Sequence, residues 1–127
     1  MKGRRLLVMD DEPDICNLVR DVAEPMGFEV LACTDPRSFA QNVNDFAPTD
    51  ILLDIVMPDL DGIELIRWLA TQGTTARITA MTGVNTRYAE LAGSIASSLG
   101  LGTVRTLAKP ASIKELRRHL AAGFTEA

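Results

Sequence analysis

Five short apolar runs alternate along this chain with segments whose apolar residues recur at helical spacing. The runs are residues 6–9, 28–33, 51–53, 78–81 and 104–107. Short continuous runs are typical of strands buried on both faces, and parallel strands need a long crossover, usually a helix, between them. The sequence therefore predicts an α/β fold in which helices cover both faces of a five-stranded parallel sheet.

Capping signals and helical spacing locate the segments between the strands. Asp35 before Pro36 predicts a helix that runs to residue 44, because aspartate caps helices and proline suits the first turn. Segments 61–64 and 112–115 have the form of capping boxes, and Gly73 is the predicted end of the helix that begins at 61. The remaining helices are predicted from apolar residues at 15, 18, 19 and 22 and at 91, 95 and 99.

The composition supports one compact domain over residues 1–127. Hydrophobic residues make up 46% of the chain and charged residues 24%, which is ordinary for a globular protein of this length. No apolar run approaches the ~20 residues that span a bilayer and no signal peptide is visible, so we expect a cytoplasmic protein without membrane contact. A net charge of −4 argues against direct nucleic-acid binding. Cys16 and Cys33 lack metal-ligand spacing and are expected to be buried thiols rather than a disulfide.

Polar residues follow four of the five predicted strands. Asp10 and Asp11 follow the first strand, Asp54 follows the third, Thr82 follows the fourth, and Lys109 comes shortly after the fifth. In open parallel sheets, ligands bind beyond the carboxyl ends of the strands. These side chains are therefore expected to converge at one edge although they are far apart in the sequence.

The converging residues form a set that suits phosphoryl transfer. Three carboxylates held together repel one another, which favours a hard cation with oxygen ligands such as Mg²⁺. Lys109 offers a compact positive charge and Thr82 a hydroxyl donor, both of which suit an anion with several acceptor oxygens. An aspartate can also form an acyl phosphate. Helix capping is the alternative role for aspartates at such positions, and it applies in part to Asp11.

The motifs in this order resemble the response-regulator receiver family over nearly the whole chain. The matching pieces are Asp10-Asp11, Asp54 within segment 52–62, Thr82-Gly83 and Lys109-Pro110, each after a predicted strand. Each piece alone is weak, but their combined order is specific. The resemblance implies a flavodoxin-like (βα)5 doubly wound fold with strand order 2-1-3-4-5 and a role in two-component signalling.

The resemblance also implies the chemistry of the phosphoryl group. Asp54 would accept it from a sensor histidine kinase or a histidine phosphotransfer protein, Thr82 would hydrogen-bond it and Lys109 would pair with it. A receiver catalyses only its own phosphorylation and dephosphorylation. Its switched face would then act on a downstream protein or on a fused output domain.

Mg²⁺ is the cofactor that the resemblance implies. Asp11 would hold the ion directly and Asp10 partly through water. Asp54 and the backbone carbonyl of Val56 would complete the protein ligands.

Two residues stand outside this scheme. The family usually has an aromatic residue three positions before the lysine that rotates inward on activation, and here that position is Thr106. A smaller or different change is therefore expected in the face formed by the fourth helix, the fifth strand and the last helix. His119 is the only histidine, and its predicted place on a helix far from the site indicates a surface role.

Two other functions fit parts of the pattern. A Mg²⁺-dependent phosphatase with an aspartyl intermediate would want a second acid two residues after the nucleophile, where this chain has Val56. A pseudo-receiver would signal by protein contact without phosphorylation, and its mark would be missing acids or a missing lysine. None of Asp10, Asp11, Asp54 and Lys109 is missing.

Overall fold

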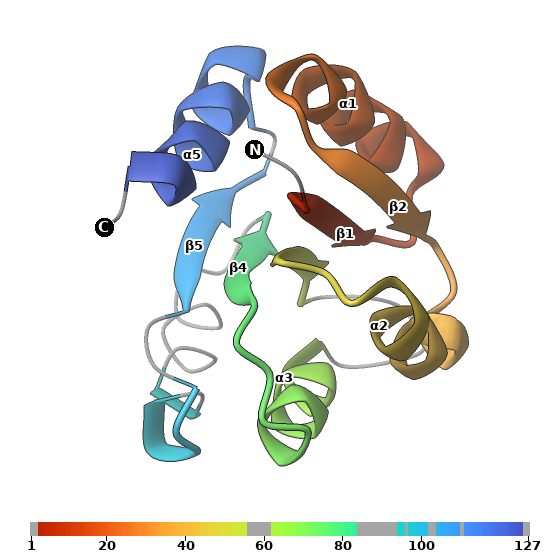
Figure 1. Ribbon diagram of the computed structural model, residues 1–127, viewed down its shortest axis with the longest axis vertical. Helices are drawn as coiled ribbons and strands as arrows, with labels where there is room; N and C mark the ends of the chain where they lie inside the picture. Colours follow the sequence, from red (N-terminus) through yellow and green to blue (C-terminus); the bar gives the residue numbers. More distant parts are fainter. Residues whose placement is uncertain are drawn as a thin grey trace.

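The computed structural model describes residues 3–55, 62–83, 94–95, 97–101, 104–109 and 111–125, without the side chains of 82 and 122–125. Its strands form one parallel sheet in the order β2-β1-β3-β4-β5 (Figure 1). The strands are β1 (Arg5–Met9), β2 (Glu29–Cys33), β3 (Asp50–Asp54), β4 (Arg77–Thr82) and β5 (Arg105–Ala108). The predicted fold class and strand order are confirmed.

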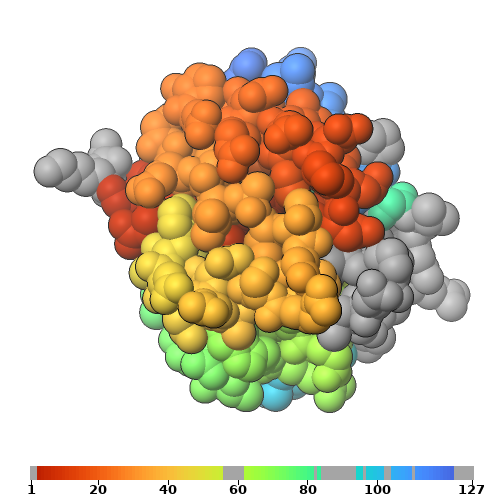
Figure 2. Space-filling model, turned by 90° about the vertical axis from the view of Figure 1, so that its right-hand side faces the viewer, coloured from red at the N-terminus to blue at the C-terminus, as the bar shows by residue number. Residues whose placement is uncertain are grey.

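Helices cover both faces of the sheet. The α-helices are α1 (Pro13–Ala23), α2 (Phe39–Phe46), α3 (Gly62–Thr71) and α5 (Ile113–Thr125), with short 3₁₀ turns at Glu24–Met26 and Pro36–Ser38. In Figure 1, α1 and α5 lie on one side of the sheet and α2 and α3 on the other. Figure 2 shows the molecule from another side, with orange-red residues of α1 above, β2 and α2 residues between, and green residues of α3 below. None of the helices among the described residues has the length and apolarity that crossing a bilayer requires.

Alternation along the strands divides the apolar side chains between two cores. Leu6 and Val8 of β1 belong to the core under α1 and α5, whereas Leu7 and Met9 belong to the core under α2 and α3. This is the period of two expected when successive side chains point to opposite faces of a sheet. The central strand β3 is buried along its whole length. The end of β3 that carries Asp54 is therefore fixed by packing on both faces of the sheet.

The predicted helix signals are confirmed in part. The capping box at 112–115 forms fully, because Ser112 N donates to Glu115 Oε1 at 3.0 Å and Glu115 N donates to Ser112 Oγ at 3.1 Å. Asp35 accepts a hydrogen bond from Arg37 N at 2.9 Å, but it begins a 3₁₀ turn, and α2 starts only at Phe39. Asp61 of the other capping box and most of the predicted helix around 91–99 lie outside the described residues.

The prediction of a surface role for His119 is wrong. The ring is half-buried on the inner side of α5, and Nε2 lies 2.7 Å from Oγ1 of Thr79 on β4. Burial, together with the positive charge of Arg105, lowers the pKa of His119 to about 4. Spacing alone could not reveal this, because a histidine is compatible with either side of an amphipathic helix.

This lowered pKa predicts a loss of stability in mild acid. The folded state keeps His119 neutral while the unfolded chain takes up a proton near pH 6.5, so the contribution is complete above pH 6.5 and falls as the pH approaches 4. After allowance for screening of a half-exposed ring, we expect about 1 kcal/mol between pH 7 and pH 5. Urea unfolding of the wild type and of His119→Gln at both pH values measures this. Equal pH dependence in the two proteins would contradict it.

Candidate functional site

The carboxyl ends of β1, β3 and β5 bring three predicted site residues together. Asp10 directly follows β1, Asp54 is the last residue of β3, and Lys109 directly follows β5. Lys109 Nζ lies 2.7 Å from Oδ2 of Asp10 and 3.2 Å from Oδ2 of Asp54. Residues far apart in the sequence therefore meet in one ion-pair cluster, at the edge where the sequence predicts a site.

The charged groups of this cluster are largely buried, which opposes their ionisation. Asp10 is 0% exposed, Asp54 is 4% exposed, and the side chain of Lys109 is 14% exposed. Burial raises the pKa of Asp10, and the ion pair with Lys109 offsets only part of that effect. Burial also opposes the charge on Lys109, but its contacts with Asp10 and Asp54 outweigh burial and raise its pKa. The cluster therefore holds a firmly protonated lysine and carboxylates whose negative charge is incompletely neutralised.

A third acid, Glu12, adds to this negative charge. Glu12 Oε1 lies 3.4 Å from Lys109 Nζ, and carboxylate oxygens of Asp10, Asp11 and Glu12 lie within 4.8 Å of one another. Asp10 Oδ1 accepts a hydrogen bond from Glu12 N at 2.9 Å. Glu12 is a site residue that the sequence analysis missed, because in sequence it is simply one more acid before a helix.

The acids of the cluster fit a divalent cation. Among the described residues, Lys109 pairs with Asp10, Glu12 and Asp54, and Asp11 lies beside Asp10 and Glu12. Oδ2 of Asp10 is buried, and apart from its ion pair with Lys109 it has no hydrogen-bond partner among the described residues. Hard cations such as Mg²⁺ bind to carboxylate oxygens in this way and retain waters in their other positions. The donor set therefore suits Mg²⁺, with Asp10, Asp11 and Asp54 as the predicted side-chain ligands.

The other predicted site residues are described only in part. Thr82 is the last residue of β4, and its backbone pairs with Ala108, directly before Lys109. The sheet thus brings the Thr82 backbone to the same edge as the acids, while its side chain lies outside the described atoms. Val56 and Pro110 also lie outside the described residues, so the predicted backbone ligand stays a prediction.

Both cysteines are free and buried, as predicted. Cys16 Sγ lies 3.5 Å from the carbonyl oxygen of Asp10, and burial raises the pKa of this thiol to about 11. A thiol with so high a pKa is a poor nucleophile at neutral pH. Cys16 therefore contacts the backbone of Asp10 as a neutral thiol at neutral pH.

Gly62 is a second residue whose role the sequence analysis missed. Gly62 N donates to the carbonyl oxygen of Ile55 at 3.0 Å, which brings the start of α3 against the end of β3. A Cβ atom at this position would collide with Cα of Ile55 and lie 2.8 Å from the carbonyl oxygen of Asp54. Glycine is therefore required here for close approach to the backbone that carries Asp54.

Replacing Gly62 with alanine is expected to lower the free energy of unfolding by about 1–3 kcal/mol, because the added methyl group must displace backbone atoms. Gly83→Ala is a matched control, because a Cβ there meets no atom within 4 Å. Urea unfolding of the two variants measures the difference. Equal stability of Gly62→Ala and Gly83→Ala would show that this contact is not tight.

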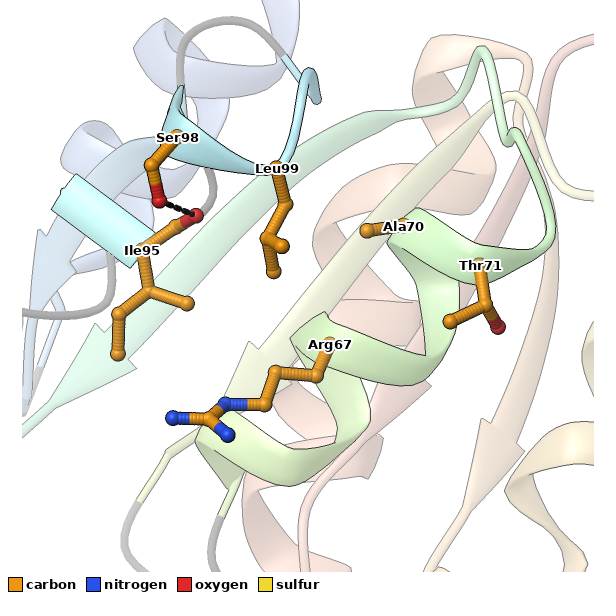
Figure 3. Close-up of a pocket in the computed structure, with 6 residues that line it drawn as sticks. All are labelled: Arg67, Ala70, Thr71, Ile95, Ser98 and Leu99. Atoms are coloured by element: carbon orange, nitrogen blue, oxygen red, sulfur yellow. Dashed lines mark hydrogen bonds between the residues drawn. The ribbon is translucent and has the colours of Figure 1, made fainter.

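Two hollows of the described surface lie away from the acids. One of about 690 Å³ lies at the opposite end of the strands, beside Arg5 and Thr49. Another of about 480 Å³ lies between α3 and the segment that carries Ile95 and Leu99 (Figure 3). Neither hollow therefore belongs to the site at the carboxyl ends of the strands.

Comparison with known proteins gives a consistent result. Residues 6–121 match the response regulator receiver domain family. The chain is 29% identical over 117 residues to sporulation initiation phosphotransferase F of Bacillus subtilis, covering 92% of this chain and 90% of that protein. It is 29% identical over 120 residues to the alkaline phosphatase synthesis transcriptional regulatory protein PhoP of the same organism, covering 94% of this chain.

Other relatives differ in length, and solved structures agree with the fold. The chain spans only 48% of that PhoP protein, and about a third to a half of several other curated relatives. The crystal structure of a response regulator from Colwellia psychrerythraea matches with a TM-score of 0.77 at 32% identity, covering 94% of each chain. With its strand order, its acidic cluster and this match, the chain belongs to the response-regulator receiver domain family of two-component systems.

Proposed function

We propose that this receiver domain, over residues 1–127, accepts a phosphoryl group on Asp54 in a Mg²⁺-dependent reaction. The observation that carries the proposal is the position of Lys109 Nζ, 2.7 Å from Asp10 and 3.2 Å from Asp54. A buried carboxylate beside a largely buried ammonium is a nucleophile with a partner already in place for a phosphoryl anion.

The residues divide the chemistry between them. A carboxylate oxygen of Asp54 attacks the phosphorus atom of a phosphohistidine or a small acyl phosphate. The bond from phosphorus to the donor's nitrogen or oxygen breaks, its electron pair leaves with the donor, and an acyl phosphate forms on Asp54. Lys109 then exchanges its contact with the free carboxylate for one with the phosphoryl oxygens, and Thr82 donates a hydrogen bond to them. Apart from the bond to Asp54, the protein contributes mainly positioning and charge neutralisation, on which such reactions depend.

Mg²⁺, when bound, neutralises charge on the phosphoryl oxygens and on the surrounding carboxylates. Asp10, Asp11 and Asp54 would hold it with the backbone carbonyl of Val56. Glu12, which the sequence analysis did not include, lies close enough to contribute negative charge or an outer contact.

The partners that we propose are other proteins of a two-component signalling pathway. A sensor histidine kinase or a histidine phosphotransfer protein would supply the phosphoryl group, and a downstream protein or fused output domain would respond to the switched face. The near full-length similarity to a sporulation initiation phosphotransferase supports a relay role for a domain of this size. We propose that the domain catalyses only its own phosphorylation and dephosphorylation, because the group that would receive the phosphoryl group, Asp54, belongs to the chain itself.

Incubation with acetyl phosphate tests the proposal. In the presence of Mg²⁺, intact mass spectrometry is expected to show one phosphoryl adduct that is labile in acid and in base. The same incubation with a chelator in place of Mg²⁺ is expected to give none. An equal adduct under both conditions, or no adduct with Mg²⁺ present, would contradict the proposed function.

A further inference from the structure

A polar contact lies under α5, beside apolar side chains of the core. Leu116 and Leu120 of α5 are buried in the core between this helix and the sheet. Between them along the helix, His119 points its ring at β4, where Nε2 lies 2.7 Å from Oγ1 of Thr79. Thr79 is 4% exposed, so leaving its hydroxyl without a hydrogen-bond partner would be unfavourable. The two side chains therefore hold each other in place.

A second strand bonds to the same residue of α5. Arg105 Nη2 donates to the carbonyl oxygen of His119 at 3.1 Å, and Arg105 lies opposite Thr79 in the register of β4 and β5. The imidazole is neutral at pH 7, and a neutral ring carries one donor nitrogen and one acceptor nitrogen. His119 therefore makes a directional bond to β4 through its side chain and a second bond to β5 through its backbone.

The strand that contacts His119 also contacts the phosphoryl site. Thr79 lies three residues before Thr82 on β4, and Asp54 lies opposite Met81 in the register of β3 and β4. Ile55 N, directly after Asp54, donates to the carbonyl oxygen of Met81 at 3.3 Å. A shift of β4 that accompanies a change at Asp54 would therefore also move Thr79, the hydrogen-bond partner of His119.

Apart from the bonds of Thr79 and Arg105 to His119, the described contacts of β5 with α5 are apolar. β5 has the sequence Arg-Thr-Leu-Ala and carries no aromatic side chain. Thr106 is exposed and lies opposite Ala80, whose side chain belongs to the core on the other face. Leu107 packs in the core under α5, but apolar packing has no fixed direction. The hydrogen bond of Thr79 to His119 is thus the directional side-chain contact between β4 and α5 among the described residues.

We propose that the Thr79–His119 hydrogen bond couples the phosphoryl site to α5, with His119 as the positioning residue that makes α5 follow β4. The inference rests on the proposed function, since it concerns the response to a group at Asp54. In this chain Thr106 stands at the position of the usual aromatic residue. The inference therefore assigns the link between the site and α5 to Thr79 and His119.

Amide chemical shifts test this coupling. Wild type, His119→Leu, His119→Gln and Thr79→Val are labelled with ¹⁵N and titrated with Mg²⁺ and beryllium fluoride, a tetrahedral mimic of the phosphoryl group. In the wild type, amides at Asp10, Asp54 and Lys109 and amides of α5 are expected to shift together. In His119→Leu and Thr79→Val, the site amides shift as before, while the α5 shifts fall at least about twofold. His119→Gln retains a hydrogen-bonding side chain and is expected to recover part of the α5 response.

The outcomes separate this inference from the proposed function. Undiminished α5 shifts in both His119→Leu and Thr79→Val, with normal shifts at the site, would overturn the coupling and leave the proposed function standing. An absence of site shifts in the wild type would overturn the proposed function, and the coupling with it. His119→Leu and Thr79→Val remove the same hydrogen bond from its two ends. If one variant fails to fold, the other still tests the coupling.

Discussion

Asp54→Asn is expected to reduce phosphoryl adduct formation from acetyl phosphate by at least about a hundredfold. The substitution keeps the size and the buried place of the side chain at the end of β3 but replaces the carboxylate nucleophile with a neutral amide. Intact mass spectrometry after incubation with Mg²⁺ measures the loss. The loss of adduct is expected because the nucleophile is removed, not because the fold is damaged. The variant should unfold at or above the temperature of the wild type, because removing one negative charge relieves repulsion among the acids.

Asp50→Asn is the matched control for this experiment. Asp50 begins the same strand that Asp54 ends, and it is also buried. It lies at the end of β3 opposite the acidic cluster and is expected to leave adduct formation unchanged. A similar loss in both variants would mean that the effect arises from damage to β3 rather than from removal of the nucleophile.

Lys109→Met is expected to lower the free energy of unfolding by about 3 kcal/mol at pH 7 in the absence of Mg²⁺. The lysine faces two buried carboxylates, and its removal leaves Asp10 and Asp54 close together without their cation. Burial raises the pKa of Asp10 and Lys109 counteracts this, so without the lysine Asp10 takes up a proton more readily as the pH falls from 7 to 5. The difference from the wild type should therefore shrink in acid. Urea unfolding at both pH values measures the effect.

Mg²⁺ and an exposed lysine provide the controls for Lys109. A cation that binds the folded state stabilises it by mass action, so added Mg²⁺ should recover part of the stability that Lys109→Met loses. Lys114 is exposed on α5 and makes no contact with the acids among the described residues, so Lys114→Met should have little effect. If Lys109→Met is as stable as Lys114→Met at pH 7 without Mg²⁺, the lysine does not neutralise the cluster.

The sheet and its acids could be predicted because both are encoded locally. Each strand is a short apolar run, and parallel topology requires the residues that follow the strands to meet at one edge. Asp10, Asp54 and Lys109 meet there as predicted. The structure extends each predicted strand or shifts its bounds by only one or two residues, as for β3, which takes in the acids at 50 and 54.

The contacts that the sequence could not reveal depend on three-dimensional packing. Gly62 is read in sequence as part of a capping box, but its tight approach to the backbone of Asp54 follows from how α3 meets β3. The partner of His119 is 40 residues away in sequence, and no periodicity connects Thr79 with that helix position. Glu12 approaches Lys109 only because β1 and β5 end at the same edge. In each case the missing information is a contact between elements rather than a property of one element.

The position of the phosphoryl group tests the central claim most directly. The protein is phosphorylated with acetyl phosphate and Mg²⁺, digested rapidly in the cold and mapped by tandem mass spectrometry. The account predicts one modified residue, Asp54, with unmodified Asp10, Asp11 and His119. A phosphoryl group mapped to any of those three residues, with Asp54 unmodified, would contradict it.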